Sequence, residues 1–223
     1  MFIIENKWFR PNPTHAIFDF HLPGYPVIPG AISAGFIHQA HREQYSQNTA
    51  VDILLQRPIT KYTQFKLSIQ SNLSQLSDIN ANPLVTLRPT NNPKQPHILQ
   101  ISNIKKSASR IKRPSELIFH NEFFYYENIA ECIIHYENIL ATRSYLSSLM
   151  HKNYFICLET MGNLAMELCL STPQEVFLFH SFKDVWFNWQ KISGELIITT
   201  LARRLNSKLI QWSAQIKNKN KVL

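Results

Sequence analysis

The sequence predicts an α+β protein with two copies of the same arrangement of elements. Each copy is a single long helix embedded among antiparallel strands. Strand-like runs, separated by Asn, Pro and Ser clusters, accompany both predicted helices. The second helix is apolar on nearly every face, which is typical of a buried helix, so the surrounding sheet must curl to cover it. The same order of elements recurs after a basic segment near the middle of the chain.

The first copy begins with Ala16–Phe20, predicted as extended, and continues through a Pro/Gly-rich turn into a helix at Gly30–Tyr45, which is rich in small residues. Strands are expected at Asp52–Leu55, Phe65–Gln70, Leu84–Leu87 and His97–Ser102. The segment Asn103–Glu116 is basic and poor in apolar residues, which is typical of a linker. We therefore predict domains at 1–103 and 117–223, joined by a basic linker at 104–116.

The second copy is predicted to contain one helix, Asn153–Leu170, whose Glu167 we expect to reach solvent near the helix end. Its strands are expected at Leu117–Tyr126, Ile129–Tyr136, Val176–Phe182, Val185–Gln190, Leu196–Arg203 and Lys208–Ile216.

Composition narrows the class of protein. The chain has 223 residues, 44% of them hydrophobic and 17% charged, which excludes a disordered chain. No run approaches the ~20 apolar residues of a membrane span, and the N-terminus lacks a secretory leader, so we expect a cytoplasmic protein without membrane insertion. The three cysteines have no CxxC spacing and are interpreted as buried thiols. A net charge of +8 favours acidic partners: nucleic acid, anionic lipid or an acidic carrier protein.

The most informative stretch is residues 21–30, HLPGYPVIPG. Three prolines and two glycines in ten residues specify a rigid path that leads directly into a helix. That path places backbone N–H groups around Gly30 at a helix N-terminus, where they can donate to a carbonyl oxygen that gains negative charge.

This stretch resembles the HFPGxPVxPG signature of the 3-hydroxyacyl-acyl-carrier-protein dehydratases, which have the hotdog fold. The resemblance implies a double hotdog, two curled antiparallel sheets each wrapped around one central helix. It also implies that His21 is catalytic, that the Gly30 amide binds the thioester carbonyl, and that Gln39 supports the site. The remaining motif positions implied to support the site are Pro23, Gly24, Val27 and Pro29. The family's second catalytic group, a carboxylate on the central helix, would stand at residue 35, which here is glycine.

The second copy carries the missing group. Residues 155–163 resemble the carboxylate-bearing helix of the family and place Glu159 at the carboxylate position. Tyr145 precedes Glu159 by the same interval as His21 precedes Gly35, and residues 153–154 replace the Pro-Gly pair. Because the histidine and carboxylate of one site come from different subunits in family dimers, the resemblance implies one composite site from His21 and Glu159. Gly35 and Tyr145 would belong to a degenerate second site.

The implied reaction is dehydration of a 3-hydroxyacyl thioester carried on acyl carrier protein, in fatty-acid or polyene/polyketide biosynthesis. Imidazole titrates near neutrality and suits a base at C2, while burial raises the pKa of a carboxyl and lets it supply a proton to the leaving hydroxyl. No cofactor or metal is required beyond the phosphopantetheine of the carrier. His38 and His41 have a ligand-like spacing but lack a nearby set of Asp, Glu or Cys ligands, so we expect no metal site.

Alternatives remain open at this point. His21 could be a structural histidine, and the Glu159 carboxylate could reach the surface or a backbone N–H. The chain could be a non-catalytic hotdog protein that binds acyl carrier protein or partners another dehydratase subunit, or a hotdog thioesterase that uses its carboxylate to activate water. A nucleic-acid binder is disfavoured because no such motif accompanies the charge. A homodimer or a hetero-oligomer with another hotdog protein is compatible with the fold that the resemblance implies.

Overall fold

The computed structural model divides into two compact units that are interleaved along the chain. The first unit comprises Met1–Lys94, Tyr145–Phe155 and Phe179–Asn188, and the second comprises Gln95–Ser144, Ile156–Leu178 and Trp189–Leu223. The structure describes the chain except residues 6, 23, 46–48, 91–102, 104, 112–114, 173–174, 176, 188–191, 219–220 and 223. The division of the sequence into 1–103 and 117–223 remains a prediction.

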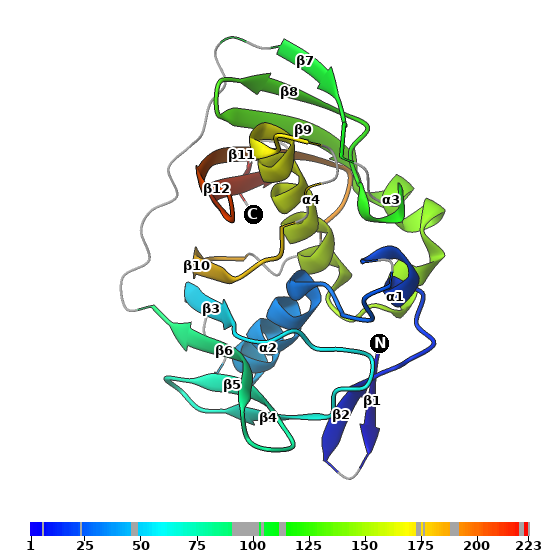
Figure 1. Ribbon diagram of the computed structural model, residues 1–223, viewed down its shortest axis with the longest axis vertical. Helices are drawn as coiled ribbons and strands as arrows, with labels where there is room; N and C mark the ends of the chain where they lie inside the picture. Colours follow the sequence, from blue (N-terminus) through cyan, green and yellow to red (C-terminus); the bar gives the residue numbers. More distant parts are fainter. Residues whose placement is uncertain are drawn as a thin grey trace. The chain divides into compact units, whose positions relative to one another are not determined.

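The first unit contains a seven-stranded antiparallel sheet with the order β1-β2-β4-β5-β6-β3-β10. Its strands are β1 (Phe2–Glu5), β2 (Trp8–Pro11), β3 (Val51–Leu55), β4 (Phe65–Ile69), β5 (Ser74–Asp78), β6 (Pro83–Pro89) and β10 (Ser181–Val185). The helix α2 (Gly30–Tyr45) packs against β3, β4, β5 and β6, which curve around it (Figure 1). Its buried residues include Ala31, Ala34 and Gly35, small residues that allow neighbouring elements to approach closely.

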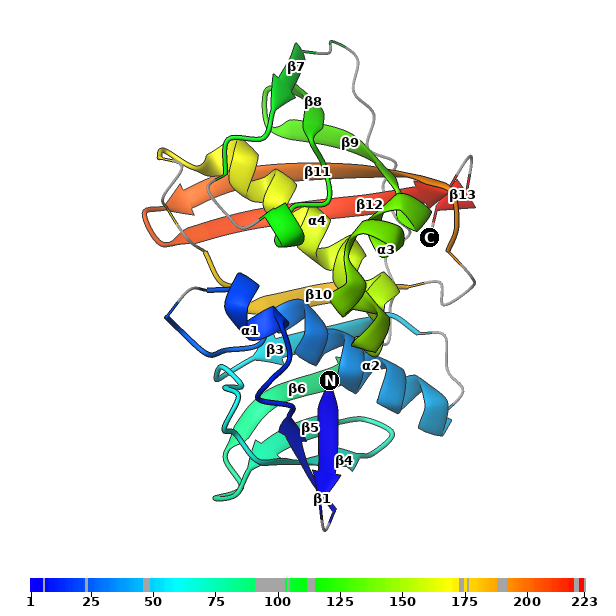
Figure 2. The ribbon, with the colours of Figure 1, turned by 90° about the vertical axis from the view of Figure 1, so that its right-hand side faces the viewer.

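The second unit contains a six-stranded antiparallel sheet with the order β13-β12-β11-β9-β8-β7. Its strands are β7 (Lys105–Ala108), β8 (Glu122–Tyr126), β9 (Ile129–His135), β11 (Glu195–Asn206), β12 (Leu209–Asn218) and β13 (Lys221–Val222). The helix α4 (Lys152–Cys169) begins in the first unit and continues from Ile156 in the second, where it crosses the sheet obliquely at β11 and β12 (Figure 2). A shorter helix, α3 (Tyr136–Thr142), follows β9.

The two long helices confirm the sequence analysis, α2 with the predicted bounds and α4 displaced by one residue at each end. Both are buried over most of their length, and Tyr154, Phe155 and Ile156 have no exposed surface. No helix among the described residues is long and apolar enough to cross a membrane.

The prediction of an extended Ala16–Phe20 is wrong, because Ile17–Phe20 forms the short helix α1. His15 accounts for the difference. Its ring Nδ1 accepts a hydrogen bond from the Ile17 N–H at 3.1 Å, and its carbonyl accepts one from the Phe18 N–H at 3.1 Å. These bonds satisfy backbone N–H donors at the start of a helical turn. The pattern of apolar residues, from which the strand was predicted, does not reveal such bonds.

Strand prediction also failed elsewhere. The strands β1, β2 and β5 were not expected, and the predicted strands at 176–182 and 185–190 are replaced, over their described residues, by β10. β10 pairs with β3 of the first unit, with Phe182 opposite Ile53. Such a pairing depends on partners remote in sequence, so the local pattern could not specify it. The predicted strand at 97–102 lies outside the described residues.

Part of the predicted basic linker belongs to the second sheet. Lys105–Ala108 forms β7 and pairs with β8, and Lys106 forms an ion pair with Glu122 at 2.5 Å. Ile111, which follows, is buried in a cluster with Met166 and Leu170. An edge strand pairs with one neighbour and faces solvent on its other side, so it can carry basic side chains. Composition alone does not distinguish such a strand from a linker.

Candidate active site

The motif loop, Leu22–Pro29, is held in the first unit by its own turn and by a neighbouring loop. The Tyr25 N–H donates to the Leu22 carbonyl at 2.8 Å, and Gly24 adopts a φ of +85°, a conformation that favours glycine. The Ile28 N–H donates to the Ile59 carbonyl at 2.9 Å. These bonds give the loop one defined path. Pro23, predicted to support the site, lies outside the described residues.

His21 lies where α1 meets this loop. Its backbone N–H donates to the Ile17 carbonyl at 3.1 Å, and only 8% of the residue is exposed. The backbone of His21 is therefore anchored on one side by a helical turn and on the other by the turn of the motif loop.

Gly30 is the first residue of α2, and buried Pro29 precedes it. The first N–H groups of a helix have no acceptor within that helix, and the helix dipole makes this end favourable for negative charge. A Cβ at Gly30 would lie 2.6 Å from Leu55 Cδ1 and 3.3 Å from Phe179 Cβ. Glycine is therefore the residue that fits here without displacing its neighbours. Val27, also predicted to support the site, is half-buried and forms a bridge with Thr60.

Glu159 belongs to the part of α4 that lies in the second unit, and it is 1% exposed. The next turns of the helix bury further polar residues whose hydrogen bonds are defined. The Thr160 hydroxyl donates to the Ile156 carbonyl at 2.7 Å, and the Asn163 Nδ2 donates to the Leu117 carbonyl at 2.9 Å. The interpretation of Glu159 as a carboxylate that reaches the surface is therefore wrong. Its convergence with His21 stays a prediction.

The predicted second site is filled by side chains of the first unit. A Cβ at Gly35 would lie 3.1 Å from Tyr154 Cδ1 and 3.4 Å from the Cβ of His151. Tyr154 is fully buried, and its hydroxyl lies 3.3 Å from Nδ1 of His38. The missing side chain at Gly35 and the large side chain at Tyr154 therefore compensate each other in volume.

Tyr145, at the position corresponding to the motif histidine, is also packed. It is 8% exposed, and its ring centroid lies 5.4 Å from that of Phe20. Aromatic pairs at this separation contribute to the stability of a core. The two departures from the family pattern, at Gly35 and Tyr145, thus have structural roles in this chain.

The other residues singled out from the α2 sequence have contacts of their own. Gln39 donates from Nε2 to the Glu43 carboxylate at 2.5 Å, one turn along the helix. His38 faces Tyr154, whereas His41 bonds to the Ser74 hydroxyl at 2.8 Å. Burial lowers the pKa of His38 to about 3, so its ring is neutral near pH 7. Among the described residues no group of three His, Cys, Asp or Glu side chains could hold a metal ion.

A histidine and a serine that the sequence did not single out lie within hydrogen-bonding distance. His15 Nε2 is 2.8 Å from the Ser148 hydroxyl. Because Nδ1 of His15 accepts the Ile17 N–H, Nε2 carries the proton and donates it to Ser148, whose hydroxyl donates to the Tyr145 carbonyl at 2.8 Å. Burial lowers the pKa of His15 to about 4 and keeps the ring neutral. The ring cannot accept the serine proton in this arrangement, so the pair is structural.

The expectation that Glu167 reaches solvent is wrong, because its side chain is fully buried. Its carboxylate accepts hydrogen bonds from the N–H groups of Arg110 at 3.0 Å and Ile111 at 3.3 Å, and from the Ser109 hydroxyl. Helical position alone did not reveal this role, since the donors come from a segment remote in sequence. Glu167 fastens the segment after β7 to the end of α4.

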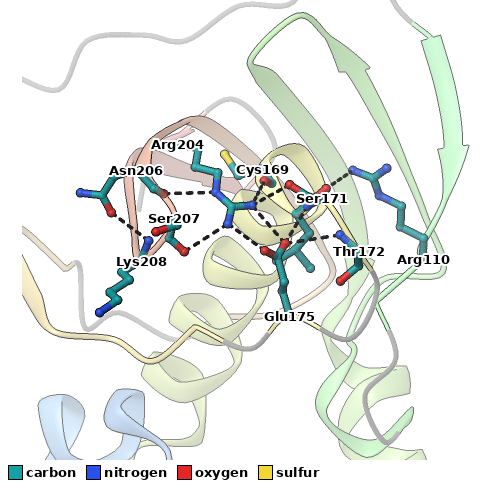
Figure 3. Close-up of polar contacts among 10 residues, drawn as sticks. Arg110, Cys169, Ser171, Thr172, Glu175, Arg204, Asn206, Ser207 and Lys208 are labelled. Carbon is teal, nitrogen blue, oxygen red and sulfur yellow. Dashed lines mark hydrogen bonds and ion pairs between the residues drawn. The ribbon is translucent and has the colours of Figure 1, made fainter.

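A second ionic cluster lies at the same end of α4 (Figure 3). Arg204 donates to both oxygens of Glu175, at 2.7 and 3.0 Å, and to the Cys169 carbonyl at 3.3 Å. Glu175 also accepts the Ser171 N–H at 2.7 Å. The Arg204 guanidinium and these N–H donors lower the pKa of Glu175 to about 2. An arginine that binds a carboxylate in this bidentate way and also contacts a helix-terminal carbonyl stabilises the helix end.

Two antiparallel sheets, each associated with one long central helix, define a double hotdog fold. The chain is similar in structure to the dehydratase domain of RzxB from Pseudomonas fluorescens, with a TM-score of 0.65 at 10% identity over 99% of this chain and 92% of that domain. It is also similar to the dehydratase domain from the CurJ module of curacin polyketide synthase, with a TM-score of 0.67 at 15% identity over 100% and 92%.

A third structure with this fold is the bifunctional dehydratase-cyclase domain in ambruticin biosynthesis, with a TM-score of 0.64 at 8% identity over 98% of this chain and 88% of that one. These similarities confirm the predicted fold. No protein-family model matches the chain, and no curated protein matches it in sequence.

Proposed function

We propose that the chain dehydrates a 3-hydroxyacyl thioester carried on an acyl carrier protein, at one composite site formed by His21, Gly30 and Glu159. The observation that carries the proposal is the junction in the first unit where a buried histidine, a braced Pro/Gly loop and a helix N-terminus follow one another. A carboxylate buried on the other central helix supplies the second group that the reaction requires. The polyketide dehydratase domains that share the fold support the same reaction class and favour a polyketide or related acyl pathway.

The reaction assigns one task to each group. His21 takes the proton from C2, and the Gly30 N–H donates to the thioester oxygen as negative charge develops there. The electron pair left at C2 forms the C2–C3 double bond while the C3–O bond breaks. Glu159 gives a proton to the departing hydroxyl, so that water leaves. The extra proton on the His21 ring is then returned to the Glu159 carboxylate, which restores the enzyme.

Substitution of each catalytic side chain tests the proposal. His21→Ala and Glu159→Gln are each expected to reduce dehydration of a 3-hydroxyacyl carrier-protein thioester by ~10²–10⁴-fold, the usual contribution of a general acid or base. His180→Ala and Glu122→Gln are matched controls, because both side chains are exposed. Activity within threefold of wild type in both site variants, with the fold retained by circular dichroism, would refute the composite site.

A non-catalytic function is the second candidate, and the filled positions at Gly35 and Tyr145 favour it. A chain that has lost one hotdog site to packing can serve as a binding partner of an acyl carrier or of another dehydratase subunit. Carrier binding without turnover would identify this function. Mass spectrometry of the carrier also separates dehydration, which removes water from the bound acyl group, from thioester hydrolysis, which leaves the free carrier thiol.

A further inference from the structure

Two tyrosines beside the motif loop are unusually exposed. Tyr25 is 70% exposed and Tyr62 is 73% exposed, the highest values among the exposed large hydrophobic side chains of the described residues. An aromatic side chain is costly to leave in water, and aromatic residues are enriched at the centres of protein interfaces. Exposed aromatic residues that gather in one place therefore indicate a surface for binding.

The backbone brings these tyrosines to neighbouring loops of the first unit. Tyr25 lies in the motif loop, and Tyr62 lies in the loop between β3 and β4. The Lys61 N–H donates to the Pro26 carbonyl at 2.8 Å, and Val27 forms a bridge with Thr60. Each tyrosine is thus adjacent in sequence to a residue of this connection. The motif loop joins His21 to Gly30, so both tyrosines lie on this loop or on the loop bonded to it.

The charge of this surface is positive. The Lys61 ammonium lies 5.2 Å from the centroid of the Tyr62 ring, within the range of a cation–π interaction. The segment Gln56–Gln64 contains the two basic residues Arg57 and Lys61 and no acidic residue, and the motif loop contains no charged residue. Arg57 is partly compensated by Asp78 at 3.9 Å. Lys61 is therefore the cation that is best placed to meet an acidic partner.

We propose that Tyr25, Lys61 and Tyr62 form the docking surface for the acidic carrier protein that delivers the acyl chain. The inference rests on the proposed function, because the partner is the one that the reaction requires. The tyrosines supply rigid contact area of mixed polarity, and Lys61 attracts carboxylates on the carrier or the phosphate of its prosthetic arm. A carrier docked here delivers its thioester next to the motif loop.

The experiment measures binding without turnover. A holo acyl carrier protein without an acyl group is labelled with a fluorophore, and its affinity for the full chain is followed by anisotropy at low and physiological salt. Tyr25→Ala, Lys61→Glu and Tyr62→Ala are each expected to weaken binding about tenfold, the scale of an interface hot spot. Lys61→Glu is also expected to reduce the dependence of affinity on salt. Lys208→Glu and Ile79→Ala, which alter exposed side chains elsewhere, are expected to bind within twofold of wild type.

Equal affinity of the docking variants and wild type would overturn the proposal, as would an equal loss in the two controls. Binding of an RNA oligonucleotide that these substitutions abolish, in place of carrier binding, would also overturn it and assign the surface to nucleic acid. Because the carrier in this assay bears no acyl group, the result is independent of catalysis. Loss of dehydration in His21→Ala with normal carrier binding, and the reverse in the docking variants, separate the two proposals.

Discussion

The packing of Tyr154 against Gly35 predicts how substitution of Gly35 changes the free energy of unfolding. Replacing Gly35 with alanine places a methyl group 3.1 Å from Tyr154 Cδ1, whereas carbon atoms prefer ~3.5–4.0 Å. Tyr154 is fully buried. Overpacking of this kind costs ~1–3 kcal/mol, and alanine regains ~1 kcal/mol over glycine in a helix. Gly35→Ala is therefore expected to reduce the free energy of unfolding by about 0–2 kcal/mol.

The sign is expected to reverse when Tyr154 is truncated. Tyr154→Ala alone removes a buried aromatic ring and its contact with His38, at a cost of ~3–5 kcal/mol. In that background the methyl group that Gly35→Ala introduces enters the space left by the ring, so only the helix-propensity gain of ~1 kcal/mol remains. The two substitutions are thus expected to be coupled by ~1–3 kcal/mol.

Urea unfolding of the four proteins of this double-mutant cycle measures the coupling. Ile79→Ala, at an exposed site in the same unit, provides the control and should combine additively with Tyr154→Ala within ~0.5 kcal/mol. If Gly35→Ala changes stability by the same amount in both backgrounds, Tyr154 does not occupy the space beside Gly35 and the second site is not closed by packing.

Three further predictions concern the second unit. Glu167→Ala should lower the free energy of unfolding by about 3 kcal/mol in urea titrations, since it leaves the buried Ile111 N–H and the part-buried Arg110 N–H without their carboxylate. A change below ~1 kcal/mol would contradict this role. The pKa of Glu175 is lowered to about 2 from 4.5. The stability that its bond with Arg204 contributes should therefore be complete above pH 4.5 and disappear as pH falls toward 2. The difference in melting temperature between wild type and Glu175→Gln measures this contribution. Burial raises the pKa of Cys157 to about 12, so iodoacetamide at pH 8 should modify half-buried Cys169 first. Faster alkylation of Cys157, measured by mass spectrometry of the peptides, would contradict this.

Much of the site's local structure could be predicted from the sequence. The motif loop and the helix at Gly30–Tyr45 depend on prolines, glycines and small residues whose conformational preferences act within a few positions. The burial of the second helix followed from its apolar residues for the same reason. The double hotdog fold was instead implied by the resemblance of residues 21–30 to the dehydratase signature.

The sequence by itself thus determined the two central helices and the braced loop that carries His21, because those features arise from local geometry and from the periodicity of apolar residues. Only the tertiary structure decided that β10 pairs with β3, that Tyr154 fills the space at Gly35 and that Glu167 binds the segment after β7. Each of these contacts joins residues remote along the chain. Their formation depends on volume and hydrogen-bond partners that become neighbours after folding, and no local pattern contains that information.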